Sequence, residues 1–169
     1  MKSKAVQFKP AMTVALLSFA LCASLVAAED AEEKVSMNKI PAAAAKTLQA
    51  QAGGEKITGL SKEKDEGRTV FEATFKKNGH VHDVTVDEAG KLVSDEMTIA
   101  LSEAPEVIRQ AIEREHPGGK VDKIEHISEG GKTNYEALIS SKGKREEIKF
   151  DSKGKVIERE DKTGAKGND

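Results

Sequence analysis

Short runs of alternating apolar and polar residues, separated by glycine-containing turns, fill most of the chain after an apolar first segment. Phe71, Ala73 and Phe75 alternate with polar neighbours, so they fall on one face of an extended strand. The Asn78-Gly79 pair that follows is a strong signal for a hairpin turn. The same pattern predicts strands over residues 56–62, 69–76, 84–86 and 91–96, and over 120–127, 135–139, 148–150 and 155–160.

Two segments show helical spacing instead. One begins at Pro105, where the missing N–H of proline costs nothing, and stops at His116-Pro117-Gly118-Gly119. The other begins at Pro41 and stops at Gly53-Gly54. The predicted core-facing stripes are Val107, Ile108, Ala111 and Ile112 in the later helix, and Ala43, Ala44, Thr47 and Leu48 in the earlier one.

The two halves of the chain resemble each other. Shifting the sequence by 64 positions aligns residues 41–96 with 105–160 without a gap, and twelve of the 56 aligned positions are identical. The pattern predicts an α+β fold of two tandem repeats, each with one helix packed on a three- to four-stranded antiparallel meander. One copy alone buries little surface, so a contiguous sheet or a shared interface between the copies would add stability.

Residues 1–28 have the pattern of a secretory signal peptide. Lys2, Lys4 and Lys9 precede an apolar run, and small residues before Ala28 suit cleavage after that residue. An uncleaved anchor and a lipoprotein attached through Cys22 are the alternatives. We therefore predict a signal peptide, a disordered linker, two repeats and a disordered tail, with boundaries at 1–28, 29–38, 39–98, 99–160 and 161–169.

Composition narrows the function classes. Lysine and arginine total 27 against 29 aspartates and glutamates, and loss of residues 1–28 changes the net charge from −2 to −5. This balance does not suit a nucleic-acid-binding protein. Cys22, the one cysteine, leaves with the signal, so a mature chain without a thiol suits an oxidising periplasmic or secreted setting. We expect no cofactor, and no membrane contact once the signal is cleaved.

The repeated motifs resemble the PepSY-like family of secreted bacterial repeat domains. The resemblance is carried by Pro41, by the turn glycines and by the segments around them, and it spans about residues 40–160. The matching segments are Gly53–Ile57, Gly67–Ala73 and Val84–Leu92, and Pro117–Val121, Gly131–Ala137 and Ile148–Val156.

The resemblance implies a fold similar to the beta-lactamase inhibitor protein, in which two such units form a concave protein-binding surface. Related modules occur in the propeptides of secreted metallopeptidases. The implied function is a non-catalytic binding or inhibitory module with a protein or peptide partner, a secreted peptidase among the candidates. Aromatic residues are 4% of the chain, with no Trp, which departs from the aromatic hot spots of tight inhibitors.

His80 and His82 are the candidate metal ligands. They flank Val81 after the Asn78-Gly79 turn, and alternation places both imidazoles on one strand face, as a zinc or copper site requires. A periplasmic metal-binding protein is therefore the alternative function, and a solvated hairpin tip is the competing interpretation. We interpret His116 as a helix-end residue and His126 as a strand-surface residue.

Two acidic pairs recur in both halves, Glu72 with Glu136 and Asp87 with Asp151. Hydrolysis by two carboxylates would need a cleft and one raised pKa. We interpret Asp87 and Asp151 as turn residues whose side chains accept hydrogen bonds from nearby backbone N–H groups. A small hydrolase thus ranks third among the hypotheses, and we predict that the protein is not an enzyme.

Overall fold

A computed structural model describes residues 32–164 except residue 66, so the predicted signal segment and its cleavage site at Ala28 lie outside the described residues. No helix within the described residues is long and apolar enough to cross a bilayer. In chain order the elements are β1 (Glu33–Lys34), the 3-10 helix η1 (Met37–Lys39), α1 (Ala42–Ala52), β2 (Ile57–Asp65), β3 (Arg68–Lys77), β4 (His80–Asp87), β5 (Leu92–Thr98), the 3-10 helix η2 (Leu101–Glu103), α2 (Glu106–Glu115), β6 (Lys120–Glu129), β7 (Lys132–Ser141), β8 (Lys144–Asp151) and β9 (Val156–Asp161).

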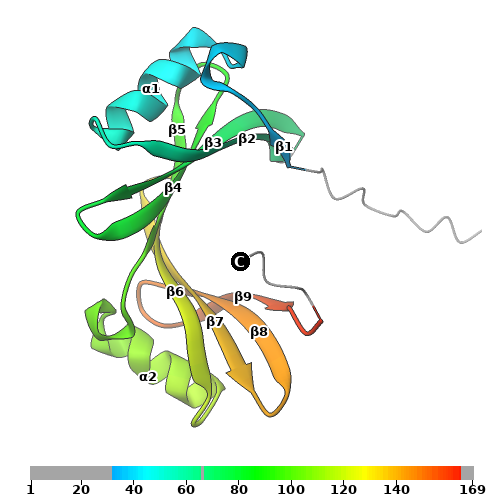
Figure 1. Ribbon diagram of the computed structural model, residues 1–169. Helices are drawn as coiled ribbons and strands as arrows, with labels where there is room; N and C mark the ends of the chain where they lie inside the picture. Colours follow the sequence, from blue (N-terminus) through cyan, green and yellow to red (C-terminus); the bar gives the residue numbers. More distant parts are fainter. Residues whose placement is uncertain (1–31, 66, 165–169) are drawn as a thin grey trace, which may run out of the picture.

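The strands form one sheet, so the predicted fold class of two tandem helix-on-meander repeats is wrong. Each strand pairs antiparallel with the next along the chain, which gives a single nine-stranded sheet in the order β1 to β9 (Figure 1). β5 pairs directly with β6, from Ser94 opposite Glu129 to Thr98 opposite Glu125. This pairing satisfies backbone groups that two separate sheets would leave unpaired at their edges. The contiguous sheet considered above is therefore the arrangement that forms.

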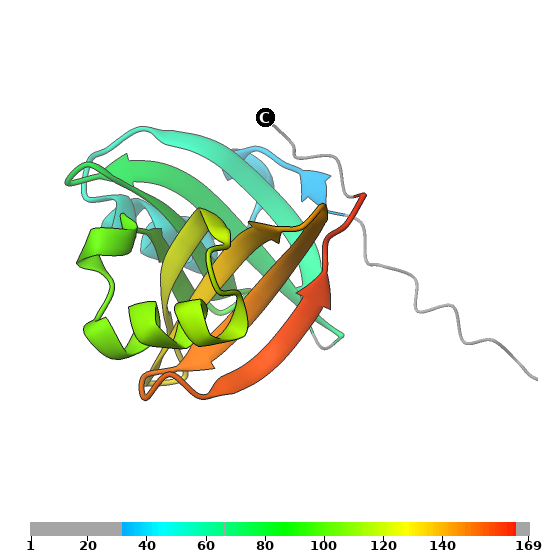
Figure 2. The ribbon, with the colours of Figure 1, turned by 90° about the horizontal axis from the view of Figure 1, so that it is seen from below.

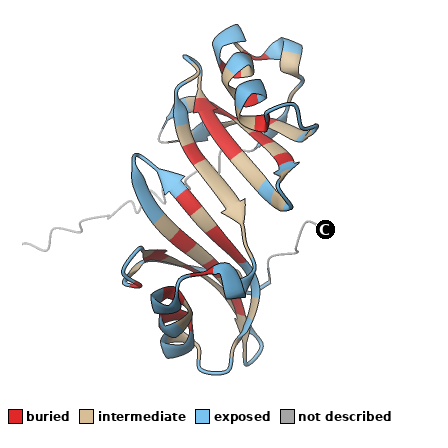
Figure 3. Ribbon diagram, turned by 90° about the vertical axis from the view of Figure 1, so that its left-hand side faces the viewer, coloured by how far each residue is buried: buried red, intermediate tan, exposed pale blue. Residues whose placement is uncertain are grey.

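The sheet is strongly curved, and both helices lie on its convex side (Figures 1 and 2). Viewed from that side, α1 and α2 lie at opposite ends, and no helix covers the strands between them (Figure 3). The strand register also places both helices on the same side of the sheet. Phe75 beneath α1 and Tyr135 beneath α2 belong to one row of paired residues, and such residues project from one face.

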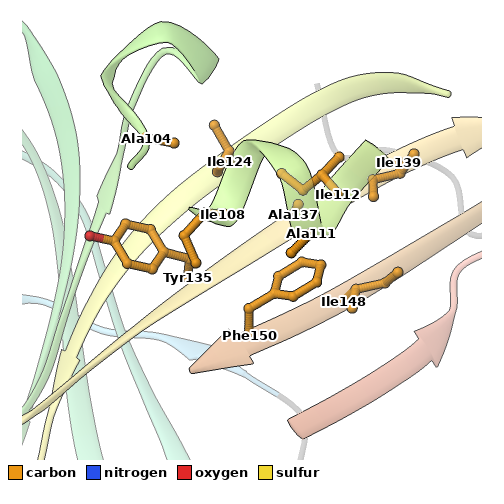
Figure 4. Packing of buried hydrophobic residues seen from close by; sticks show 10 residues of the cluster. All are labelled: Ala104, Ile108, Ala111, Ile112, Ile124, Tyr135, Ala137, Ile139, Ile148 and Phe150. Atoms are coloured by element: carbon orange, nitrogen blue, oxygen red, sulfur yellow. The ribbon is translucent and has the colours of Figure 1, made fainter. Parts of the chain in front are cut away.

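Two hydrophobic clusters fill the space between the helices and the sheet. Beneath α2, Ile108, Ala111 and Ile112 pack on residues of β6, β7 and β8, including Phe150, which is fully buried (Figure 4). Beneath α1, the cluster contains Leu48 together with Phe71, Phe75, Val84 and Val86. Alanines make up the rest of the buried face of α1, namely Ala44 and Ala52. Less apolar side chain is therefore buried beneath α1 than beneath α2.

The helix boundaries follow the sequence signals. α1 begins after Pro41 and ends at Gly53, whose φ of 65° is left-handed and whose N–H donates to the carbonyl of Gln49. α2 begins after Pro105 and ends at His116. Both predicted helices are confirmed.

Within the described residues, parts of the predicted linker and tail pair with the sheet, where disorder was expected. Residues 33 and 34 pair with β2 as β1, and the N–H of Val35 donates to the carbonyl of Leu60. β9 extends to Asp161, and the N–H of Lys162 donates to the carbonyl of Arg145. Low hydrophobicity suggested disorder, but backbone hydrogen bonding to a sheet edge does not depend on apolar side chains. Residues 165–169 lie outside the described range.

The turn between β4 and β5 presses directly on α1. Gly90 has a φ of +78°, and a Cβ built there would lie 2.5 Å from the carbonyl oxygen of Ala43. The Thr47 hydroxyl donates to the Gly90 carbonyl at 2.7 Å. Gly154 repeats the arrangement at α2, where a Cβ would lie 2.9 Å from the Val107 carbonyl oxygen. Glycine at these positions therefore sets how closely each helix approaches the sheet.

We predict that Gly90→Ala lowers the free energy of unfolding by about 2–4 kcal/mol. Alanine is strained in the left-handed backbone conformation of residue 90, and its Cβ would clash with the carbonyl of Ala43. Gly67→Ala is the matched control, since Gly67 has the same φ of +78° with no atom within 4 Å of the added Cβ. The control should lose only about 1–2 kcal/mol. Urea denaturation measures both, and equal losses would show that the close approach to α1 contributes nothing.

Candidate functional site

The side of the sheet opposite the helices is polar and strongly acidic. We call it the open face; it is the concave side in Figure 1. Strand alternation places its side chains away from the two hydrophobic clusters, and the cross-strand register brings them into rows. Its charged residues include Glu63, Glu72, Asp83, Glu96, Glu125, Glu129, Glu136, Glu147, Glu158 and Glu160, with Lys123 and Lys149.

One row crosses the middle of the open face. Ser61, Glu72, Thr85, Ser94 and Glu129 are successive partners across strands β2 to β6. Over this row lies a pocket of about 280 Å³, whose other lining residues include three more acidic side chains and Lys149. A second pocket of about 150 Å³ lies over the later strands and is lined by Glu136, Glu147, Lys149, Glu158 and Glu160.

The carboxylates in these pockets repel one another. Burial, followed by the charges of Asp83 and Glu63, raises the pKa of Glu72 to about 7. Burial, followed by the charges of Glu147 and Glu96, raises the pKa of Glu136 to about 7. The pKa of Glu96 is raised as well, first by burial and then by Glu125. The open face therefore holds negative charge at the cost of folding stability.

Three lysines offset part of this charge. Lys162 follows β9, and its Nζ lies 2.8 Å from Glu160 Oε2 and 3.4 Å from Glu147 Oε1. The other two lie on the open face itself. Lys123 Nζ lies 2.7 Å from Glu125 Oε1, and the Glu125 side chain is 7% exposed. Lys149 Nζ lies 3.6 Å from Glu129 Oε2. Both lysines also lower the pKa of Glu96, yet burial and neighbouring acids keep the net shift upward. The negative charge is thus only partly neutralised, which favours binding of cationic groups.

The two recurring acidic pairs have different roles. Asp151 Oδ1 accepts hydrogen bonds from the N–H groups of Lys153 and Lys155, and these bonds, with that of Lys155 the largest effect, lower its pKa. Asp87 Oδ1 likewise accepts from the N–H of Lys91 at 2.8 Å. The interpretation of both aspartates as turn residues is confirmed. The glutamate pair instead lies on the open face, one in each pocket.

His80 and His82 lie on the helix-bearing side of the sheet, and each has its own partners. His80 Nδ1 donates to the carbonyl of Thr98 at 3.0 Å, and its Nε2 lies 3.6 Å from Glu103. His82 Nδ1 donates to Asp95 Oδ1 at 2.9 Å, and its ring stacks on Phe75. In the part of the chain that the structure describes, no three His, Cys, Asp or Glu side chains form a group that could hold a metal. A metal at His80 and His82 stays a prediction.

The other two histidines occupy different surroundings. His116 ends α2, as interpreted from the sequence, and its Nε2 lies 2.5 Å from Glu146 Oε2. Arg159 of β9 binds the same Glu146 and also Glu115, so this network attaches the end of α2 to the sheet edge. His126 lies in β6 with its ring edge-on to Tyr135.

Sequence reasoning found part of the open face and missed its centre. Strand alternation in the sequence puts Glu72, Thr74, Asp83 and Thr85, with Asn134, Glu136, Glu147 and Lys149, opposite the apolar side chains of their strands, whereas Thr69 shares the side of Phe71. Glu96, Glu125 and Glu129 were not assigned to it. They come together because β5 pairs with β6. Alternation of Ser94, Glu96 and Thr98 was the available signal, but the neighbour of that strand was unknown.

Comparison with known proteins supports the family resemblance. Residues 91–158 match the beta-lactamase-inhibitor-like, PepSY-like family, which confirms the resemblance for this part of the chain. No curated protein matches the sequence.

Several solved bacterial structures are similar in fold. A DUF2874 family protein from Bacteroides uniformis is 19% identical with a TM-score of 0.63, and the match covers 75% of this chain and 92% of that one. A protein from Bacteroides eggerthii described as periplasmic is 18% identical with a TM-score of 0.64, covering 76% and 93%. A BLIP-like protein from Bacteroides fragilis is 15% identical with a TM-score of 0.60, covering 77% and 92%. At sequence identities this low, the comparison shows similarity of fold and nothing more.

The raised pKa values of Glu72 and Glu136 predict a pH-dependent stability. The folded protein binds these two protons more tightly than the unfolded chain, whose glutamates titrate near 4.5. The stabilisation from these two protons should therefore be complete below about pH 4.5 and be lost as the pH rises to about 7. Because solvent screens half-buried carboxylates, we expect the free energy of unfolding to fall by about 1–2 kcal/mol per group.

Glu72→Gln and Glu136→Gln should each raise the free energy of unfolding at about pH 8 by that amount and leave it little changed at about pH 5. Glu88→Gln, at an exposed turn position, controls for the loss of one negative charge. Urea denaturation across this pH range measures the effect. A wild-type profile that neither glutamine variant flattens would contradict the prediction.

Proposed function

We propose that this chain, whose second half is PepSY-like, is a non-catalytic protein-binding module that holds its partner on the open face. The observation that carries the proposal is the set of mutually repelling carboxylates on a concave, helix-free sheet face. Such groups cost stability in the free protein. A partner that brings cationic side chains among them removes the repulsion and gains charge-assisted hydrogen bonds.

The partner class follows from the charge and from the resemblance. Lysine or arginine side chains on the partner suit pockets lined by Glu72, Glu96 and Glu136. A secreted peptidase is the proposed partner, because related modules occur in peptidase propeptides and a fold neighbour is described as BLIP-like. Binding of this kind would restrain the peptidase by covering part of its surface.

The proposed location is the periplasm or the medium outside the cell. Residues 1–28 have a basic start, an apolar run and small residues before Ala28, which is the pattern of an exported protein. A fold neighbour described as periplasmic supports the same location. Export without Cys22 would leave a mature chain with no thiol to oxidise.

Affinity capture from the extracytoplasmic proteins of the source bacterium tests the proposal. The bait is the mature protein, and the matched baits carry Glu129→Lys with Glu158→Lys on the open face, or Glu55→Lys with Glu113→Lys on the helix side. All four positions are exposed, and both double variants change the net charge equally. A partner on the open face should be lost with the first double variant and kept with the second.

The captured protein should also elute as the salt concentration rises, because screening weakens contacts between exposed charges. Addition of the purified bait should reduce the activity of a captured peptidase. Capture that survives the open-face substitutions, or no discrete partner at any salt concentration, would overturn the proposal.

Metal binding at His80 and His82 is the second candidate function. One observation favours it, because the hydrogen bond from His82 Nδ1 to Asp95 leaves Nε2 available as a ligand. Calorimetric titration with zinc and with copper should show binding that His80→Ala and His82→Ala each abolish. Binding that persists in His80→Ala would exclude this pair as the site.

A further inference from the structure

A row of aromatic, imidazole and thioether side chains crosses the helix-bearing side of the sheet between the two helices. Phe75, His82, Met97, His126 and Tyr135 are successive partners on strands β3 to β7. Directly paired residues project from the same face, so the five side chains stand next to one another. Phe75 belongs to the cluster beneath α1 and Tyr135 to the cluster beneath α2, whereas the three central residues belong to neither.

We propose that His82, Met97 and His126 form a binding site for a monovalent copper ion. Cross-strand neighbours have Cβ atoms about 4.5–5.5 Å apart, so the Cβ atoms of His82 and His126 lie on either side of the Cβ atom of Met97. The proposed site forms when one ring nitrogen of each histidine and the Met97 sulfur turn toward a shared ion. The proposal does not depend on the protein-binding function, which concerns the opposite face of the sheet.

The donor set selects the metal. A thioether is a soft ligand that suits Cu(I), and imidazole is compatible with copper. Two neutral imidazoles and a thioether add no negative charge, which suits a singly charged ion better than zinc, calcium or magnesium. The set includes a methionine, so it differs from the group of three or more His, Cys, Asp or Glu that the described residues lack.

The contacts of the His82 ring suit it to act as a metal ligand. Its Nδ1 donates to Asp95 Oδ1 at 2.9 Å, and since a carboxylate oxygen accepts, Nε2 is the nitrogen with a free lone pair. A carboxylate that orients a histidine in this way is the usual outer partner of a metal ligand. The ring also stacks on Phe75 at 5.5 Å between centroids, and its side chain is 14% exposed.

His126 supplies the second nitrogen. Its ring is half-buried and lies edge-on to Tyr135 at 5.4 Å between centroids. Among residues 32–164, residue 66 apart, neither of its ring nitrogens has a hydrogen-bond partner in the structure. No helix covers the strands between α1 and α2 (Figure 3), and Met97 and His126 are each partly exposed, so an ion can reach the row from solvent.

This site differs from the pair predicted from the sequence. His80 lies two residues before His82 on the same face, but its Nδ1 donates to Thr98 and its Nε2 faces Glu103. His80 therefore ties β4 to β5 and η2, and it is not needed for the copper site. Its substitution separates the two hypotheses.

Anaerobic competition with a colorimetric cuprous chelator tests the proposal on the purified protein. The wild type should take one copper ion per chain from the chelator. Met97→Leu, which keeps the side-chain volume, and His126→Asn should each lose this ability, whereas His80→Ala should keep it. Asp95→Asn should weaken binding by about tenfold, as loss of an outer partner does.

X-ray absorption of the copper-loaded protein adds a readout that folding defects do not imitate. A sulfur ligand should be present in the wild type and absent in Met97→Leu, and circular dichroism checks that each variant is folded. Copper binding that Met97→Leu and His126→Asn leave unchanged would overturn the proposal. Loss of binding in His80→Ala, or a copper spectrum without sulfur in the wild type, would overturn it as well.

Discussion

The backbone pairing of β5 with β6 is the contact on which the rest of the structure depends. It joins the last strand of the first half to the first strand of the second half, from Ser94 and Glu129 to Thr98 and Glu125. Without it, each half would expose a strand edge with free N–H and C=O groups. With it, both helices share one side of a single sheet, and the opposite side becomes one continuous acidic surface.

The acidic surface shows how strand geometry can force like charges together. Alternation fixes which side chains face away from the helices, and antiparallel register fixes which of them are neighbours. Asp83 is paired with Glu96, and Glu125 is paired with Glu136, so carboxylates meet directly across strands. Burial is the main reason that the pKa values of Glu96 and Glu136 are raised, and the charges of neighbouring carboxylates raise them further. A surface that lowers the stability of the free protein in this way is suited to a cationic partner.

Where β5 meets β6, the helix-bearing side of the sheet differs from the acidic open face. α1 and α2 each cover their own cluster, and the strands between them carry His82, Met97 and His126, which belong to neither cluster. His82 stacks on Phe75, His126 lies edge-on to Tyr135, and Met97 is the strand partner of both histidines. The two faces of the sheet at the β5–β6 junction therefore carry different groups. The open face carries carboxylates, and the helix-bearing face carries two imidazoles and a thioether.

The sequence by itself determined the local elements. Pro41 and Pro105 mark the helix starts, and the apolar alternation of Phe71, Ala73 and Phe75 marks the buried face of its strand. The turn roles of Asp87 and Asp151 also followed from local sequence, because their hydrogen bonds reach only a few residues along the chain. These features are local, and short-range spacing in the sequence is enough to specify them.

Only the tertiary structure decided how the halves join and which side chains meet. The spacing of residues along the chain does not predict that β5 and β6 pair, because the pairing depends on two strand edges meeting in space. The centre of the open face and the row of His82, Met97 and His126 both follow from that pairing. Residues so far apart in the chain become neighbours only through long-range register, which is why the separate repeats expected from the sequence appear in the structure as one sheet.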